Sequence, residues 1–443
     1  MPFDPAQGLE LVETARDFEE TTASGLPTRS PDEIMSTSEH RGFCKLMPRM
    51  NKSRPNPTPQ GDSVLAPSSR RQWLKTGGAA LLTGVMLSRS RAFAGPQPAP
   101  AAPAGPAPRP ISLALNENPF GPSPRALAAI QADLAGLHRY TGDEAAALAH
   151  QIAAFENVAP EQILLGEVLE PLGLHLGLQG GPGAEYVYSV PGYPALVDAA
   201  GRVGGVVVPV PLNDNLENDL PALAARVNAR TKAVFLVNPH NPSGTVSPAA
   251  EFTAFAEAVS KRALVVVDEA YLEFCDDFRG RTAANLTRAG ANVIVFRTFS
   301  KAHGLAALAF GYAVAPRPLA DFLRSRGVGF ARDLNRLSIA AASGSLSDPA
   351  QIDRVRLLVT DERNAWHNDL NALGLRHTAA AGNFVYFDAG RPADEVAAAF
   401  AREGIVIGRV FPPYNTWVRI SIGLPEENAR ARAVARRLLT SHI

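Results

Sequence analysis

The chain has 443 residues, of which 46% are hydrophobic and 19% are charged, a composition typical of a globular protein rather than a disordered one. Lysine plus arginine equals aspartate plus glutamate at 43 each, and no basic stripe interleaved with aromatic residues occurs, which argues against a nucleic-acid partner. The two cysteines, Cys44 and Cys275, lie far apart and predict neither a disulfide framework nor a thiolate metal site.

Residues 69–94 have the pattern of a twin-arginine export signal. Arg70 and Arg71 precede a weakly apolar stretch, a short basic flank and an Ala-x-Ala cleavage pattern that ends before Gly95. The apolar stretch at 76–87 is too short to span the roughly 30 Å of hydrocarbon in a bilayer, so we expect no stable membrane insertion once the signal is cleaved. The pattern predicts export of the folded protein to the periplasm.

The segments on either side of this signal are not expected to belong to the folded domain. Residues 1–68 are long for a region ahead of such a signal, and Met47 or Met50 would be a more natural start. We therefore expect residues 1–68 to be unstructured, or to reflect an over-extended start. Residues 95–110 are rich in proline and alanine, which is typical of a semi-rigid spacer.

Short apolar runs alternate with helix-length segments from about residue 150 to 320. The runs lie at 185–190, 205–210, 233–237, 263–267 and 292–296. Runs of this kind indicate strands that are buried on both faces of a mostly parallel sheet. One intervening helix is marked by Ser247 as its cap and Pro248 as its first residue. Residues 150–320 are therefore predicted to form a large α/β domain.

The remaining segments predict a smaller α+β domain. Its expected elements are a helix at 353–373, strands at 384–387 and 418–422, and a helix after Pro425. We assign residues 321–443 to this small domain. Residues 111–149 are expected to supply an N-terminal arm and a further part of it.

Three of the predicted strands end in polar clusters. The clusters read Asn-Pro-His-Asn-Pro-Ser-Gly at 238–244, Asp-Glu-Ala-Tyr at 268–271 and Arg-Thr-Phe-Ser-Lys at 297–301. In an open parallel sheet, ligands bind beyond the carboxyl ends of the strands. The clusters therefore predict a ligand site at one edge of the sheet.

In these clusters the chain resembles the class I/II pyridoxal-phosphate-dependent aminotransferases, and the opening Asn-Glu-Asn-Pro-Phe-Gly-Pro at 116–122 is similar to that of the histidinol-phosphate aminotransferase branch. The resemblance covers most of residues 111–430. It implies an aspartate aminotransferase-like α/β fold, with a mostly parallel seven-stranded sheet covered by helices and a smaller α+β domain. It also implies pyridoxal 5′-phosphate as cofactor, amino-acid and 2-oxo-acid substrates, and a homodimer with shared active sites.

The resemblance gives the cluster residues roles around the cofactor ring. Lys301 would form a Schiff base with the cofactor and carry the proton that is transferred. Asp268 would pair with the pyridinium nitrogen and keep it protonated. Tyr271 and Asn241 match positions that hydrogen-bond to the phenolic oxygen, and Tyr193 matches the aromatic that stacks on the ring. Either tyrosine could instead pack in the core.

Further positions match contacts to the phosphate. Thr298 and Ser300 match its hydroxyl donors, and Tyr140 matches a tyrosine that reaches the phosphate from a neighbouring subunit. His303 is either a local phosphate ligand or a solvent-facing histidine.

Two arginines match contacts to the substrate. Arg419 matches the arginine that binds the substrate α-carboxylate, for which a planar guanidinium is well suited. A surface arginine on an edge strand is the alternative. Arg409 is a candidate second anion contact.

The chain departs from the family at the phosphate. A glycine-serine turn at a helix N-terminus is replaced by Gly166, Glu167 and Val168, and Ala309 stands where an arginine belongs, eight residues beyond the lysine. Loss of a charge-assisted anchor typically costs about 1.5 to 3 kcal/mol. An active enzyme and a non-catalytic binding protein with the same fold both remain open.

Transamination is the activity implied by the resemblance. Racemisation, decarboxylation and oxidation are alternatives, because the sequence does not show which bond at the substrate Cα is activated. Histidine biosynthesis is a cytoplasmic pathway, whereas the export signal predicts a periplasmic protein. We therefore expect a broad or unusual amino-acid substrate.

Overall fold

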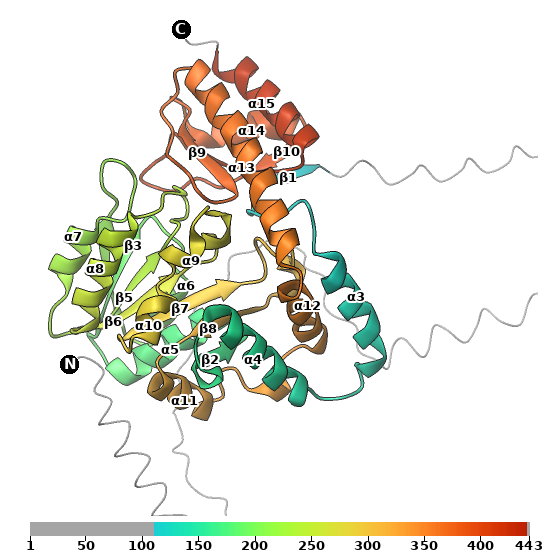
Figure 1. Cartoon of the computed structure of the whole chain (residues 1–443). Coiled ribbons are helices and arrows are strands. Elements are labelled where there is room, and N and C mark those ends of the chain that lie inside the picture. The colour runs from blue at the N-terminus through green and yellow to red at the C-terminus, as the bar shows by residue number, and fades with distance from the viewer. Residues whose placement is uncertain (1–109, 441–443) are drawn as a thin grey trace, which may run out of the picture. The chain divides into compact units, whose positions relative to one another are not determined.

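The computed structural model describes residues 110–440, in which a seven-stranded sheet forms the centre of the larger domain. The strands, in their order across the sheet, are β2 (Ile163–Leu165), β8 (Gly311–Val314), β7 (Val293–Thr298), β6 (Leu264–Asp268), β5 (Thr231–Val237), β3 (Glu185–Val190) and β4 (Val206–Pro211). The five strands from β7 to β4 run parallel, and β8 is antiparallel to both of its neighbours. The predicted mostly parallel sheet is confirmed (Figure 1).

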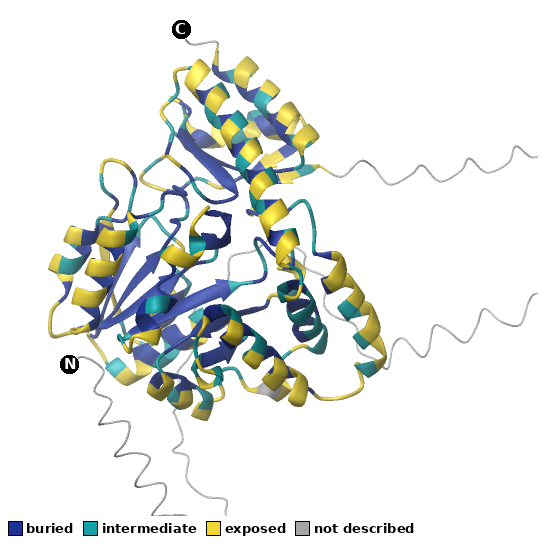
Figure 2. Ribbon diagram, in the orientation of Figure 1, coloured by how far each residue is buried: buried dark blue, intermediate teal, exposed yellow. Residues whose placement is uncertain are grey.

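Helices cover both faces of this sheet (Figure 1). They are α4 (Asp143–Glu156), α5 (Leu169–Gly180), α6 (Ala195–Arg202), α7 (Leu220–Arg226), α8 (Ala249–Ser260), α10 (Ala284–Arg288), α11 (Arg317–Ser325) and α12 (Arg336–Leu346). Along β5, Phe235 and Val237 share a core with α5, α6 and α11, whereas Val234 and Leu236 share a second core with α4, α7, α8, α10 and α12. Both faces of the central strands are buried, as the dark strands of Figure 2 show, which explains their unbroken apolar runs. The edge strand β4 is mostly exposed, with Val206 and Val207 on the surface, so the expectation that the run at 205–210 is buried on both faces is wrong.

The smaller domain carries two short sheets. In the first, β9 (Phe384–Asp388) pairs antiparallel with β11 (Trp417–Ser421); in the second, β1 (Ile111–Leu113) pairs parallel with β10 (Ile405–Ile407). Its helices are α13 (Pro349–Ala372), α14 (Ala393–Arg402) and α15 (Pro425–Leu439). One apolar core runs from β5 in the large sheet to β9 in the small one. The start and the end of the described chain therefore meet in this domain.

Several helices belong to a different domain than the sequence suggested. Helix α3 (Pro124–Asp133) packs on α12, and α4 packs on both α12 and β2. Leu148 of α4 and Ile339 of α12 lie in the core beneath the large sheet. Helix α11 also contacts β2. The boundary expected at residue 320 is thus too early, because the chain crosses to the small domain only with α13.

Helix α8 begins one residue later than predicted. Pro248 is its N-cap and the helix starts at Ala249. The Ser247 hydroxyl makes no hydrogen bond to the described residues, whereas the Ser247 backbone N–H donates to Asn238 Oδ1 at 3.0 Å. Ser247 therefore joins the loop after β5 to the helix rather than capping it.

The expected extension at 1–68, the signal at 69–94 and residues 95–109 of the spacer lie outside the described residues. Within residues 110–440, no helix combines the length and the apolar character needed to cross a bilayer.

Candidate active site

The carboxyl ends of the large-sheet strands and the adjoining small domain line a cavity of about 690 Å³. This volume falls in the range of small-molecule sites. Most of the predicted site residues line it, namely Tyr193, Asn241, Asp268, Tyr271, Thr298, Ser300, Lys301, Arg409 and Arg419. The members from the large domain meet because β3, β5, β6 and β7 run parallel and end at the same edge, whereas Arg409 and Arg419 come from the small domain.

Lys301 follows β7 and extends its amine into the cavity. Its Nζ donates a hydrogen bond to the Leu115 carbonyl at 2.9 Å. Burial and the positive charge of Arg419 lower the pKa of this amine, although carboxylates such as Asp268 and Glu167 oppose the shift. A lowered pKa increases the neutral, nucleophilic fraction of a lysine near neutral pH.

Asp268 ends β6 and is buried at the floor of the cavity. Its Oδ1 accepts a hydrogen bond from the Ala270 backbone N–H at 3.0 Å. Burial raises the pKa of this carboxyl to about 6, against the opposing effects of the Ala270 hydrogen bond and Lys301, and Glu167 raises it further. No cationic side chain among the described residues forms an ion pair with Asp268. A protonated ring nitrogen would supply the missing positive charge.

Tyr271 places a buried phenol beside Asp268. Its oxygen accepts hydrogen bonds from Asn116 Nδ2 at 3.1 Å and Asn241 Nδ2 at 3.4 Å. Burial raises the pKa of Tyr271 to about 12, so the hydroxyl keeps its proton and can donate to an oxygen in the cavity. Asn116 is a site residue that was not predicted. The sequence signal that could have identified it is its place as the first residue of the Asn-Glu-Asn-Pro motif.

Two guanidinium groups lie on the small-domain side. Arg419, buried in β11, donates from Nη1 to Asn241 Oδ1 at 2.6 Å and from Nη2 to the Ala114 carbonyl at 2.7 Å. The guanidinium groups of Arg409 and Arg419 lie 4.5 Å and 5.0 Å from the ring centroid of Phe411. The two cations therefore share one end of the cavity, where they suit an anionic ligand group.

His303 does not line this cavity, which contradicts both expectations for it. Its ring packs against Phe299 with centroids 4.7 Å apart, and Nδ1 lies 2.7 Å from Ser345 Oγ. Burial lowers the pKa of His303 to about 3, so it carries no charge near neutral pH. It is neither a phosphate contact nor a solvent-facing residue.

Tyr140 also lies away from the cavity of its own chain. Its side chain is 85% exposed. A contact from this residue to a cofactor would have to be made across a subunit interface, as the resemblance implies. That role stays a prediction.

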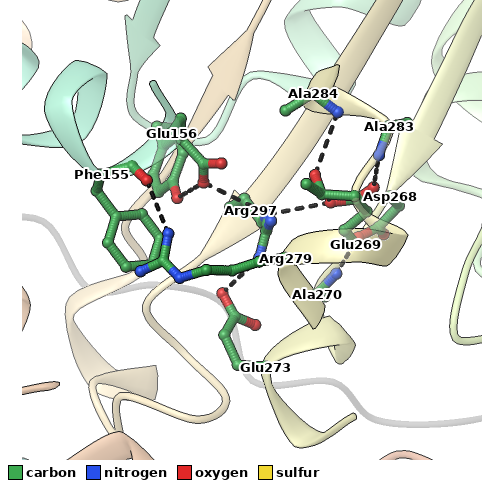
Figure 3. Close-up of polar contacts among 12 residues, drawn as sticks. Phe155, Glu156, Asp268, Glu269, Ala270, Glu273, Arg279, Ala283, Ala284 and Arg297 are labelled. Atoms are coloured by element: carbon green, nitrogen blue, oxygen red, sulfur yellow. Dashed lines mark hydrogen bonds and ion pairs between the residues drawn. The ribbon is translucent and has the colours of Figure 1, made fainter. Parts of the chain in front are cut away.

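A buried ion cluster supports the strand ends and was not predicted (Figure 3). The Arg297 guanidinium, at the end of β7, lies 3.0 Å from Glu273, 3.1 Å from Glu269 and 3.7 Å from Glu156. Glu269 also accepts hydrogen bonds from the Thr282 hydroxyl at 2.8 Å and the Ala283 backbone N–H at 2.7 Å. The sequence did contain a signal for this cluster, because two of its charged residues, Glu269 and Arg297, belong to the polar motifs at the strand ends.

The cluster holds three carboxylates against one guanidinium. Burial raises the pKa of Glu269 to about 7, although Arg297 opposes the shift. The Tyr312 hydroxyl donates to Glu156 at 2.5 Å and stabilises a second carboxylate. Glu269 follows Asp268, and Arg297 precedes Thr298, so the cluster ties together the backbone segments that carry cavity residues.

Residues 108–436 match the family described as aminotransferase class I and II. The chain belongs to this family. Histidinol-phosphate aminotransferase 2 of Hydrogenovibrio crunogenus is 34% identical over 332 residues, which cover 74% of this chain and 88% of the relative. An aromatic amino acid aminotransferase of Thermobifida fusca is 38% identical over 333 residues, with 74% and 90% covered.

A solved structure agrees with this assignment. The crystal structure of histidinol-phosphate aminotransferase from Sinorhizobium meliloti in complex with pyridoxal-5′-phosphate shares 31% identity, with a TM-score of 0.67 over 74% of this aminotransferase and 92% of that chain. The predicted family and the aspartate aminotransferase-like fold are thus confirmed.

Replacing Asp268 should stabilise this aminotransferase in the absence of ligand. The carboxyl pKa rises from 3.8 to about 6 on folding. Below pH 3.8 the group is protonated in both states and imposes no cost, whereas above pH 6 it is ionised in both and the folded state bears the full cost of the buried charge. Asp268→Asn should therefore raise the free energy of unfolding at pH 8 by about 3 kcal/mol and change it little near pH 4.

Chemical denaturation of the ligand-free protein at both pH values measures this difference. Asp198→Asn, at an exposed position on α6, makes the same chemical change and should have little effect at either pH. A loss of stability in Asp268→Asn at pH 8 would show that the charge is well compensated in the ligand-free state.

Proposed function

We propose that this aminotransferase binds pyridoxal 5′-phosphate in the cavity and transfers an amino group between an amino acid and a 2-oxo acid. The observation that supports this most strongly is the convergence of the Lys301 amine, the buried Asp268 carboxylate and the Tyr271 phenol. When bound, the cofactor supplies a protonated pyridine ring that withdraws electrons from the substrate Cα. The three side chains match the aldehyde, the ring nitrogen and the phenolic oxygen of such a ligand.

Each side chain would then have a defined task. The Lys301 amine would hold the cofactor covalently and, once substrate has displaced it, take the proton from the substrate Cα. Asp268 would keep the ring nitrogen protonated, because no other cation within residues 110–440 is bonded to its buried carboxylate. Tyr271 and Asn241 would position the phenolic oxygen, and Tyr193 would form one wall of the ring site.

The substrate carboxylate would bind at the end of the cavity that carries Arg419. Arg419 is held in place by Asn241 and the Ala114 carbonyl, so its position is fixed before substrate arrives. Arg409 would add a second positive charge for a substrate with another acidic group. The substrate class would therefore be an α-amino acid. A broad or unusual side chain is proposed only because the expected export separates this protein from the cytoplasmic pathway of histidine biosynthesis.

The working form would be a homodimer. Apolar side chains on α3 and in the segment that follows it are exposed in the single chain, namely Leu127, Leu134, Leu137 and Tyr140. A second subunit would cover them and bring Tyr140 to the neighbouring cavity.

Lys301→Ala should abolish covalent cofactor binding. With added pyridoxal 5′-phosphate, the wild-type protein should show a visible absorbance band, and borohydride should fix the cofactor to the protein irreversibly. Lys301→Ala should lose this fixation, whereas Lys261→Ala, which removes an exposed lysine, should retain it. Borohydride fixation that persists in Lys301→Ala would place the reactive amine elsewhere.

The reaction itself is tested with amino acids and a 2-oxo-acid acceptor. Conversion of the band to the pyridoxamine form supports transamination. A band that substrates do not convert in this way indicates racemase, decarboxylase or oxidase chemistry instead. Absence of any band, even with added cofactor, would favour a binding protein that has lost catalysis.

Ala309→Arg should strengthen cofactor retention. Ala309 has an exposed side chain on the segment between Lys301 and β8, next to the cavity edge formed by Thr298 and Gly311. A charge-assisted contact to a phosphate would lower the Kd about tenfold to a hundredfold. Ala307→Arg adds the same charge two residues earlier and should have a smaller effect. Equal Kd values in Ala309→Arg and the wild type would contradict this placement of the phosphate.

Export is proposed on the sequence pattern. Replacing Arg70 and Arg71 by lysine should leave the protein uncut in the cytoplasm of a bacterium with the twin-arginine pathway, whereas the wild type should reach the periplasm with Gly95 at its N-terminus. Cell fractionation and mass spectrometry measure both. The matched variant Arg89→Lys, Arg91→Lys should still be exported, and export of the Arg70, Arg71 variant would refute the assignment.

A further inference from the structure

The order of substituents on the pyridine ring decides where the cofactor phosphate must lie. The phosphate-bearing carbon is next to the aldehyde carbon and on the opposite side of it from the phenolic oxygen. With the ring nitrogen at Asp268, the phenolic oxygen at Tyr271 and Asn241, and the aldehyde at Lys301, the phosphate lies beyond Lys301. It is therefore directed away from the strand that leads to Asn241.

Three strand ends form that side of the cavity. The Gly166 backbone N–H, just after β2, donates to the Gly311 carbonyl at 2.8 Å, and Gly311 pairs with Thr298 across β8 and β7. Glu167 follows Gly166 and lines the cavity together with Thr298 and Ser300. A carboxylate therefore lines the same cavity as the two hydroxyls that would donate to a phosphate.

The start of α5 lies in the same place. Its N-cap is Val168, which offers no side-chain cap, so the first backbone N–H groups of the helix are available to an anion. Glu167 makes no hydrogen bond to these groups, since none to its carboxylate occurs within residues 110–440. The negative charge of the Glu167 carboxylate is therefore not satisfied by these N–H groups and would repel an anion bound at the start of α5.

Few positive charges on the described wall of the cavity counter this carboxylate. Arg409 and Arg419 lie around Phe411 in the small domain, and Arg297 is enclosed by its own carboxylates. Lys301 is the remaining cation on the described part of the cavity wall, and it would be consumed by covalent attachment. Partial desolvation raises the pKa of Glu167, opposed by Lys301 alone.

We propose that Glu167 is a specificity-determining residue that weakens binding of the cofactor phosphate, so that the cavity holds the cofactor mainly through its ring. This inference rests on the proposed cofactor site. The effect of Glu167 is distinct from that of Ala309, because a neutral alanine only fails to attract the phosphate whereas a carboxylate repels it. Two like charges about 4 Å apart in a water-like medium repel by about 1 kcal/mol, which corresponds to roughly a fivefold to tenfold change in Kd.

The test compares two ligands that have no aldehyde and cannot react with Lys301, namely 4-deoxypyridoxine 5′-phosphate and 4-deoxypyridoxine. Their Kd values are measured by calorimetry at pH 8 on the purified full chain freed of cofactor. Glu167→Gln should lower the Kd of the phosphorylated ligand about tenfold. The unphosphorylated ligand should bind with unchanged affinity, since it lacks the repelled group.

Glu170→Gln serves as the matched control. Glu170 lies three residues further along, in the first turn of α5, and also lines the cavity, but it pairs with Arg202. The same loss of charge there should therefore have a clearly smaller effect. Equal tightening by the two variants, equal tightening of both ligands, or no change in Glu167→Gln would each overturn the role of Glu167. Failure of both ligands to bind any of the three proteins would overturn the cofactor site itself, and this inference with it.

Discussion

The buried guanidinium of Arg297 fixes the geometry on which the cavity depends. It joins the end of β7 to Glu269, which directly follows β6, and to Glu273 in the next turn. Asp268 and Thr298 are the chain neighbours of these partners, so the ion pair sets the spacing of the strand ends. Removing one partner from a buried pair leaves an uncompensated charge, at a cost of about 3 to 5 kcal/mol. The cluster therefore supports the active site from beneath, and Arg297 is its one member that also borders the cavity among the described residues.

The cavity is strongly polarised by the fold. The small domain contributes Arg409 and Arg419 to its lining, whereas the loop after β2 contributes Glu167. Lys301 and Asp268 lie between them on adjacent strand ends. In the proposed function, the carboxylate of an amino-acid substrate would bind toward the two arginines. If the cofactor phosphate lies on the side of Glu167, as proposed, substrate recognition and phosphate retention would be set by separate parts of the chain.

The sheet and most of the site could be predicted because their signals are local. A strand buried on both faces has no polar alternation, and a strand end at a ligand site is followed at once by polar residues, as Asp268 follows 263–267. Domain membership is not a local property. An amphipathic helix such as α11 shows that one of its faces is buried, but the sequence does not show against which sheet that face packs. The prediction for His303 was wrong for a similar reason. Lys301, two residues earlier, faces the cavity, but the turn between them directs the His303 ring toward Ser345, and the sequence does not show that direction.

The ligand-free cavity carries an electrostatic cost that a cofactor ring would relieve. Asp268 is a buried acid to which no cation of the described chain is bonded, and Glu167 adds a second negative charge near it. A protonated cofactor ring would neutralise the charge of Asp268, but the charge of Glu167 would still face the phosphate. If the folded protein is exported, the cofactor must be held through transport, where no replacement is at hand. The ring contacts, the covalent bond to Lys301 and a neighbouring subunit's Tyr140 would then have to supply the retention that the phosphate end does not.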